Sequence, residues 1–153
     1  MTLVITPADF TDEHLCRLIA EHLDDMHATS PAESVHALDS TGLQAVEVSM
    51  WTISRDGDLL GCGALKELSS SEGEIKAMRT TPAARGAGIG ARMLVFLVEQ
   101  ARERGYKRLS LETGSQPFFA PARRLYERHG FVECPPFADY VLDPASVFMT
   151  LEL

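Results

Sequence analysis

Hydrophobic positions recur along the chain with two different periods. Alternating or short continuous apolar runs predict strands over residues 3–6, 47–54, 59–67, 74–80, 109–112, 131–134 and 147–153. Apolar residues three or four apart predict helices over residues 12–25, 31–39, 88–104 and 120–129. The resulting order, β-α-α-β-β-β-α-β-α-β-β, is typical of an α/β (α+β) protein. We expect one mixed sheet, with an antiparallel meander before the βαβ units and helices on its faces.

Length and composition are those of one globular domain. With 153 residues, 45% of them hydrophobic, we expect a single domain over residues 1–153. The 14 basic and 22 acidic residues leave a net charge of −8, which argues against a nucleic-acid partner. No apolar run is long enough to cross a membrane, and the start of the chain lacks a signal-peptide pattern. Three scattered cysteines, Cys16, Cys62 and Cys134, fit a reducing compartment, so we expect a cytoplasmic protein.

The segment Arg85-Gly86-Ala87-Gly88-Ile89-Gly90-Ala91 lies between a predicted strand and the longest predicted helix. Glycines at such a junction let the backbone approach a ligand and leave N–H groups unpaired at the positive end of the helix dipole. This pattern indicates an anion site suited to a pyrophosphate. A nucleoside-triphosphate P-loop is excluded because no lysine follows the glycines.

A dinucleotide site is one interpretation of these glycines. Residues 86–91 fit G-x-G-x-x-A, and Glu112 stands about 20 residues further on, where a ribose-binding acid belongs. Two features weigh against a nicotinamide-binding oxidoreductase. About 80 residues precede the loop, and only 41 residues follow Glu112, too few for the second half of such a sheet.

The second interpretation also uses Arg85. Arg85-x-x-Gly88-x-Gly90 fits the Q/R-x-x-G-x-G/A signature of acyl-CoA-dependent N-acetyltransferases. Met78-Arg79-Thr80-Thr81-Pro82 precedes the loop, and Ala122-x-x-Leu125-Tyr126-x-x-x-Gly130-Phe131 follows it. On these motifs and the element order, the chain resembles the GNAT superfamily over nearly its whole length. Within that superfamily it is similar to small bacterial acetyltransferases of unassigned substrate.

The resemblance implies a GNAT-like fold with acetyl-CoA as the acyl donor. The backbone of Arg85, Gly86, Ala87, Gly88, Ile89, Gly90 and Ala91 would hold the pyrophosphate. The strand edge at Met78, Arg79 and Thr80 would pair with the pantetheine arm, and the Met78 N–H would donate to the thioester carbonyl. Tyr126 would be the general acid, with Ala122 on the same helix; the alternative is a tyrosine anchored in the core beside Phe131. Phe119 stands where the family often has asparagine, so one usual contact is missing.

Glu74 matches the position of a catalytic glutamate in some family members, and ordered water is the alternative base. Lys76, amid apolar neighbours, would hold a substrate carboxylate if it faces the site; otherwise it points outward from the strand. Glu33, His36 and Tyr140 are candidate contacts for the acceptor. The five histidines show no metal-ligand spacing, so we expect no metal. An exposed last strand over residues 147–153 would allow a homodimer through sheet extension.

We therefore expect an N-acetyltransferase that moves an acetyl group from acetyl-CoA to a primary amine of a small molecule or amino-acid-like substrate. Transfer would be direct, within a ternary complex. Three alternatives stay open. The first alternative is that the acceptor is a protein N-terminus or lysine. The others are that the protein is the nicotinamide-binding oxidoreductase considered above, or that it is a sensor that binds CoA without turnover.

Overall fold

The structure of the protein, a computed structural model, describes residues 2–153. One seven-stranded sheet has the order β1-β2-β3-β4-β5-β7-β6. This confirms the expected mixed sheet. The strands are β1 (Leu3–Pro7), β2 (Val48–Arg55), β3 (Asp58–Glu67), β4 (Glu72–Thr80), β5 (Arg108–Gly114), β6 (Val132–Glu133) and β7 (Ser146–Glu152). The helices are α1 (Glu13–Thr29), α2 (Ser40–Leu43), α3 (Ile89–Glu103) and α4 (Ala120–Arg128), with 3₁₀ turns η1 (Ala32–Ser34), η2 (Pro82–Ala84) and η3 (Pro117–Phe119).

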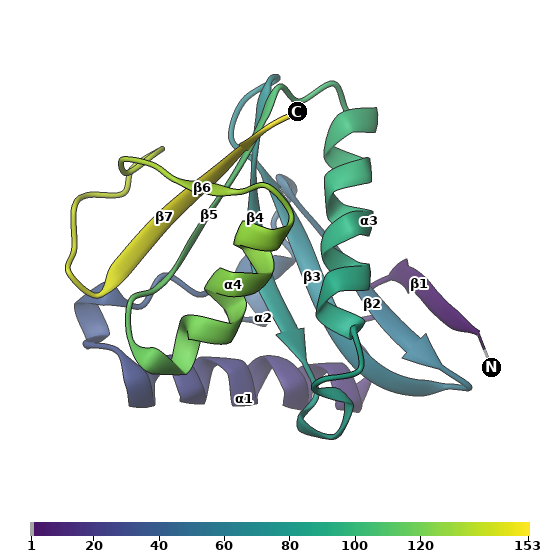
Figure 1. Ribbon diagram of the computed structural model, residues 1–153. Coiled ribbons are helices and arrows are strands. Elements are labelled where there is room, and N and C mark those ends of the chain that lie inside the picture. The colour runs from purple at the N-terminus through teal and green to yellow at the C-terminus, as the bar shows by residue number, and fades with distance from the viewer. Residues whose placement is uncertain (1) are drawn as a thin grey trace.

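Strands β4 and β5 lie side by side for only a short distance. They are the parallel pair of the sheet, and their register runs from Glu72 opposite Arg108 to Glu74 opposite Ser110. Beyond these positions the two strands separate toward their carboxyl ends, as Figure 1 shows. The separation opens the middle of the sheet at the end where the glycine-rich loop follows β4.

The helices cover both faces of the sheet (Figure 1). Helices α3 and α4 pack on one face, where residues such as Leu94 and Leu97 meet Leu65 and Ile75. Helix α1 packs on the other face, where Leu15 and its neighbours meet Met50, Cys62 and Ala64. The two cores leave the sheet buried on both sides, which explains why β3 is nearly continuous in apolar and small residues.

Two glycines in β3 permit close packing on this strand. A Cβ atom at Gly63 would lie 2.8 Å from Met93 Cγ on α3, and one at Gly61 would lie 2.7 Å from the Arg79 carbonyl oxygen on β4. Any larger residue would push helix α3 or strand β4 away. Gly63 therefore sets the distance between the sheet and α3, and Gly61 permits the close approach of β4.

Two predictions about the fold are wrong. Residues 31–39 do not form one helix, because the chain leaves the turn η1 in extended form and Asp39 then caps the short helix α2, accepting from Gly42 N at 2.8 Å. The last strand, β7, is not at the sheet edge. It lies between β5 and β6, although β6 covers only Thr150 and Met149. No helix within residues 2–153 is both long and apolar enough to cross a membrane.

Candidate active site

The glycine-rich loop adopts a conformation that requires its glycines. Gly86 and Gly88 have φ of 81° and 78°, in the left-handed region, and a Cβ atom at either would meet nothing within 4 Å. The loop surface is therefore open, and the glycines serve the backbone rather than packing. Gly88 is also the N-cap of the 15-residue helix α3.

Five backbone N–H groups at this loop find no backbone acceptor in the described part of the chain; they belong to Gly86, Gly88, Ile89, Gly90 and Ala91. Unpaired N–H groups at the start of a long helix bind anions, because the helix dipole adds to their partial positive charge. The Ala87 N–H differs from expectation, since it donates to the Ala84 carbonyl at 3.3 Å. The remaining donors suit the pyrophosphate of a CoA-like ligand.

A cavity of about 800 Å³ begins at this loop and reaches both faces of the sheet. Its walls include Gly90 and Tyr126 on the face of α3 and α4, and His22 and His36 on the face of α1. The cavity thus lies at the gap between β4 and β5. A ligand that enters from the loop can meet a second ligand that enters from the α1 face.

A β-bulge in β4 shapes this gap. The register with β3 passes from Ala64 opposite Lys76 to Cys62 opposite Arg79, so two residues of β4 lie opposite one of β3. Ala77 has φ of 53°, and its carbonyl accepts from Cys62 Sγ at 3.2 Å. Burial raises the pKa of the Cys62 thiol to about 12, so the thiol keeps its proton and can donate.

The bulge also changes the direction of the following side chains. Met78 packs with the core beneath α3, whereas Ala77 packs with the core beneath α1 and Arg79 pairs with Asp25 on α1. Met78 lines the cavity at the bulge, where the ladder is interrupted. Donation from its N–H to a thioester remains a prediction.

Tyr126 reaches the cavity from helix α4. Its side chain is 6% exposed, lines the cavity and packs edge-on against Phe131 at a centroid distance of 5.7 Å. Burial raises the pKa of the Tyr126 hydroxyl above its usual value, so this group is protonated at neutral pH. Tyr126 is therefore part of the core and also carries a protonated hydroxyl on a residue of the cavity wall.

Glu74 lies where β4 and β5 begin to separate, and it is only 2% exposed. Its Oε2 accepts from the Tyr140 hydroxyl at 2.5 Å and from Lys76 Nζ at 3.3 Å. Burial and the neighbouring Glu74 carboxylate raise the pKa of Tyr140, so this hydroxyl stays a donor. Glu74 is therefore a buried carboxylate fixed by two hydrogen bonds, and it is not a solvent-exposed charge at the start of a strand.

Lys76 matches neither of the two alternatives given for it, because it faces the cavity but its ammonium group is engaged by the protein. Besides Glu74, its Nζ donates to the His36 carbonyl at 3.1 Å and to the Tyr140 hydroxyl at 3.0 Å. These contacts use all three ammonium protons, and the side chain is 10% exposed. Lys76 faces the cavity, but it joins β4 to residue 36 and to the segment after β6.

Glu112 also lines the cavity. The sequence interpretation considered this residue only as a ribose ligand of a dinucleotide site and missed its place in this cavity. Leu111 packs in the core beneath α3 and α4, so the alternation of β5 turns Glu112 to the opposite face. Burial raises the pKa of the Glu112 carboxyl, while Ser146, His36 and Lys76 offset part of the rise. Lys76 and Tyr140 bond to Glu74 rather than to Glu112.

The cavity brings most of the predicted residues together. Glu33 is exposed and does not line the cavity, because η1 turns this side chain away. Tyr140 lies behind Glu74 and Lys76, and Ala87 borders a different hollow. The predicted residues that line the cavity are Glu74, Lys76, Met78, Arg79, Thr80, Arg85, Gly86, Gly88, Ile89, Gly90, Ala91, Phe119, Ala122, Tyr126 and His36.

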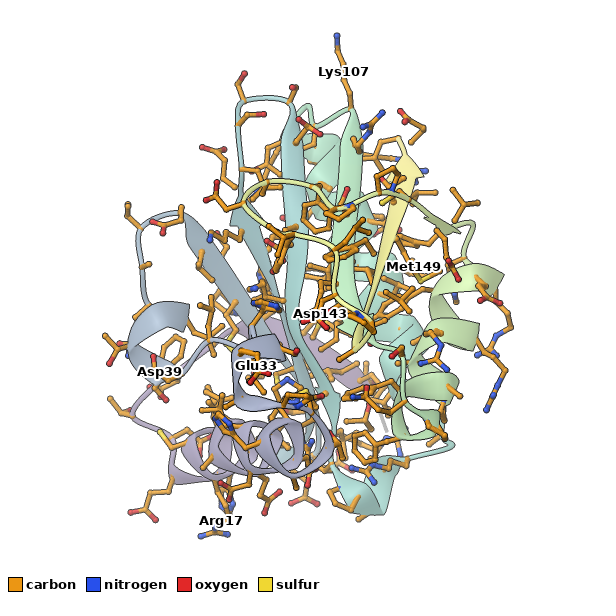
Figure 2. The ribbon with its side chains drawn as sticks, turned by 90° about the vertical axis from the view of Figure 1, so that its left-hand side faces the viewer. Arg17, Glu33, Asp39, Lys107, Asp143 and Met149 are labelled. Atoms are coloured by element: carbon orange, nitrogen blue, oxygen red, sulfur yellow. The ribbon has the colours of Figure 1, made fainter. Side chains whose placement is uncertain are left out.

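Two contacts close the α1 side of the site. Ser34 Oγ donates to Asp143 Oδ2 at 2.5 Å, and Figure 2 shows Asp143 at the centre of this face near Glu33 of η1. At the end of β5, Phe119 packs so closely against Gly114 that a Cβ atom there would clash with the ring. Phe119 therefore lines the cavity and is also buried in the protein core. In the described residues no three His, Cys, Asp or Glu side chains gather where they could hold a metal ion.

The loop, the separated strands and the cavity through the sheet are the features that a protein using an acyl-CoA requires. The profile of the Acetyltransferase (GNAT) family matches residues 14–131, and the chain belongs to this family. Its members are acetyltransferases that use acetyl-CoA, which favours CoA over a dinucleotide at the loop.

Relatives and solved structures agree with this assignment. The uncharacterized N-acetyltransferase YsnE of Bacillus subtilis is 49% identical over 95% of this chain and 96% of its own. The crystal structure of the putative acyl-CoA N-acyltransferase from Klebsiella pneumoniae is 33% identical, with a TM-score of 0.79 over 99% of this chain and 98% of that one. A GNAT family acetyltransferase from Elizabethkingia anophelis, solved with acetyl-CoA bound, shares the fold at 17% identity, with a TM-score of 0.69 over 99% and 98% of the two chains.

Proposed function

We propose that this protein transfers the acetyl group of acetyl-CoA to a primary amine of a small molecule, by direct attack of the amine on the thioester. The observation that supports this proposal most strongly is the cavity that reaches both faces of the sheet. Acetyl-CoA supplies the activated acyl group and enters from the side of the glycine-rich loop. The amine then enters from the α1 face, so both substrates are bound together.

The residues on the CoA side have two tasks. The unpaired N–H groups of the loop hold the pyrophosphate, and the Met78 N–H at the bulge donates to the thioester oxygen as negative charge develops there. Tyr126 gives its proton to the departing thiolate, because it lines the cavity on the CoA side and its hydroxyl carries a proton at neutral pH.

On the acceptor side, we assign the proton acceptor to Glu112, acting directly or through one water. Its raised pKa brings it closer to neutral pH, which suits a general base, and it lines the cavity. Glu74 is held by Tyr140 and Lys76, so it anchors the β4 side of the acceptor site instead. This replaces Glu74 as the base that the family resemblance implied.

Two variants test this division of roles. We expect Glu112→Gln to lower kcat by about 10²- to 10⁴-fold, the usual contribution of a general base, with CoA binding retained. We expect Glu74→Gln to act mainly through stability, since it weakens two buried hydrogen bonds. Release of CoA thiol with a panel of primary amines measures the first effect, and thermal melting with and without CoA measures the second.

Glu99→Gln, on the exposed face of α3, is the matched control and should change neither quantity. A larger loss of kcat in Glu74→Gln than in Glu112→Gln would contradict the assignment of the base. Failure to release thiol with any amine, despite stabilisation by CoA, would instead indicate the non-catalytic CoA sensor. Stabilisation by NADH alone would indicate the dinucleotide interpretation.

A further inference from the structure

Arg79 is a buried cation on the acceptor side of the cavity. It follows the bulge in β4, lines the cavity, and its side chain is 8% exposed. Its Nη2 donates to Asp25 Oδ2 on α1 at 2.6 Å. Asp25 is itself 39% exposed, so part of its charge is given to solvent rather than to Arg79.

The ion pair leaves Arg79 incompletely satisfied. Its Nε is buried and meets no acceptor in residues 2–153. An enclosed guanidinium donor without a partner is costly, because the lost hydration is not replaced. Arginine presents its donors in a fixed planar fork that matches a carboxylate. The unused donor therefore points to a ligand with planar oxygen acceptors.

The neighbouring groups leave this charge available. His22 lines the cavity beside Arg79, and burial and the Arg79 charge lower the pKa of His22 to about 4, so this imidazole is neutral at pH 7. Lys76, the other cation of this face at the cavity, has all three protons engaged. Arg85 and Arg128 also line the cavity, but they belong to the glycine-rich loop and the end of α4.

We propose that the acceptor carries a carboxylate as well as its amine, and that Arg79 binds this carboxylate while the amine lies near Glu112. Arg79 and Glu112 both line the cavity, Arg79 from β4 and Glu112 from β5, across the gap between these strands. A carboxylate at Arg79 and an amine near Glu112 belong to one small molecule, such as an α-amino acid or a short ω-amino acid. This inference rests on the proposed amine acetylation and narrows its substrate class.

The test compares twin amines that differ only at the carboxylate. Release of thiol from acetyl-CoA is measured for each amino acid and for its carboxamide. The amino acids are the common L-amino acids, glycine, β-alanine, 4-aminobutyrate and 5-aminopentanoate. For the best pair, we expect kcat/KM of the carboxylate twin to exceed that of the amide by about 10- to 100-fold, the usual effect of a charged hydrogen bond. In Arg79→Gln the ratio should fall to nearly one, mostly through KM. Arg79→Lys should restore part of it, because the charge stays and the fork is lost.

Arg17→Gln is the matched control, since Arg17 extends into solvent from the far side of α1 (Figure 2) and should leave the ratio unchanged. The twin comparison in the unaltered protein needs no variant and therefore holds even if Arg79→Gln fails to fold. Equal use of both twins overturns the inference, and preference for the amides points instead to a peptide N-terminus. A ratio that survives Arg79→Gln overturns the role of Arg79. Stabilisation by CoA without transfer to any amine would overturn the proposed function itself.

Discussion

The hydroxyl of Tyr140 joins the segment after β6 to the buried end of β4, so its removal should loosen the acceptor side of the site. It donates to Glu74 Oε2 at 2.5 Å and accepts from Lys76 Nζ at 3.0 Å. Tyr140→Phe deletes both bonds and keeps the aromatic packing against His36, Phe137 and Phe148. The variant therefore isolates the hydrogen bonds from the contact area.

The expected loss follows from the charges involved. A hydrogen bond to a charged group contributes about 1.5–3 kcal/mol, and here the carboxylate that loses its donor is 2% exposed. For a chain of this length, each kcal/mol lowers the melting temperature by roughly 2–4 °C, so Tyr140→Phe should melt roughly 3–12 °C lower. Thermal denaturation followed by circular dichroism at pH 7 measures this shift, and urea unfolding measures the free energy directly.

Tyr106→Phe provides the control. The Tyr106 hydroxyl donates to Glu67 at 3.0 Å, but Glu67 is exposed and water can replace the lost partner. We expect this variant to cost less than about 1 kcal/mol. If Tyr140→Phe destabilises the protein no more than Tyr106→Phe does, the buried network around Glu74 does not stabilise the fold as argued.

Two further predictions concern the buried tyrosines. Tyr126→Phe should lower kcat by about 10²- to 10⁴-fold while the stabilisation by CoA is retained, because phenylalanine keeps the contact with Phe131 and lacks the hydroxyl proton. Release of CoA thiol measures kcat, and an unchanged kcat would show that Tyr126 is not the general acid. The pKa values of Tyr126 and Tyr140 lie above that of an unfolded tyrosine, so above pH 10 the unfolded chain releases protons that the folded protein keeps. The free energy of unfolding should thus be unchanged below pH 10 and fall above it by about 1.4 kcal/mol per pH unit for each tyrosine. In urea unfolding between about pH 9.5 and 11, the double variant Tyr126→Phe and Tyr140→Phe should show a shallower decline of this free energy. An equally steep decline in the double variant would contradict these shifts.

Local patterns in the sequence were enough to predict most elements and the conformation of the glycine-rich loop. The period of apolar residues is a property of one segment at a time, so it predicted α3, α4 and the β2–β3 hairpin within a few residues. The loop at Arg85–Ala91 could likewise be interpreted alone, because positive φ and unpaired N–H groups are consequences of its own glycines and of the helix that follows. Tyr126 was predicted from the resemblance of the stretch from Ala122 to Phe131 to the family's motif, and this stretch is also local in sequence.

The acceptor side depended on contacts between distant segments, which no local pattern contains. Glu74 and Lys76 meet Tyr140 across 66 and 64 residues of sequence, and Arg79 meets Asp25 across 54. Only the folded chain shows that Lys76 is fully bonded whereas Arg79 retains a buried unpaired donor. The position of β7 between β5 and β6 is also a tertiary result, since strand order depends on which edges are free when the strand pairs. Sequence periodicity thus determined the elements and the anion loop, while the meeting of remote charged side chains on one sheet face decided what the second substrate encounters.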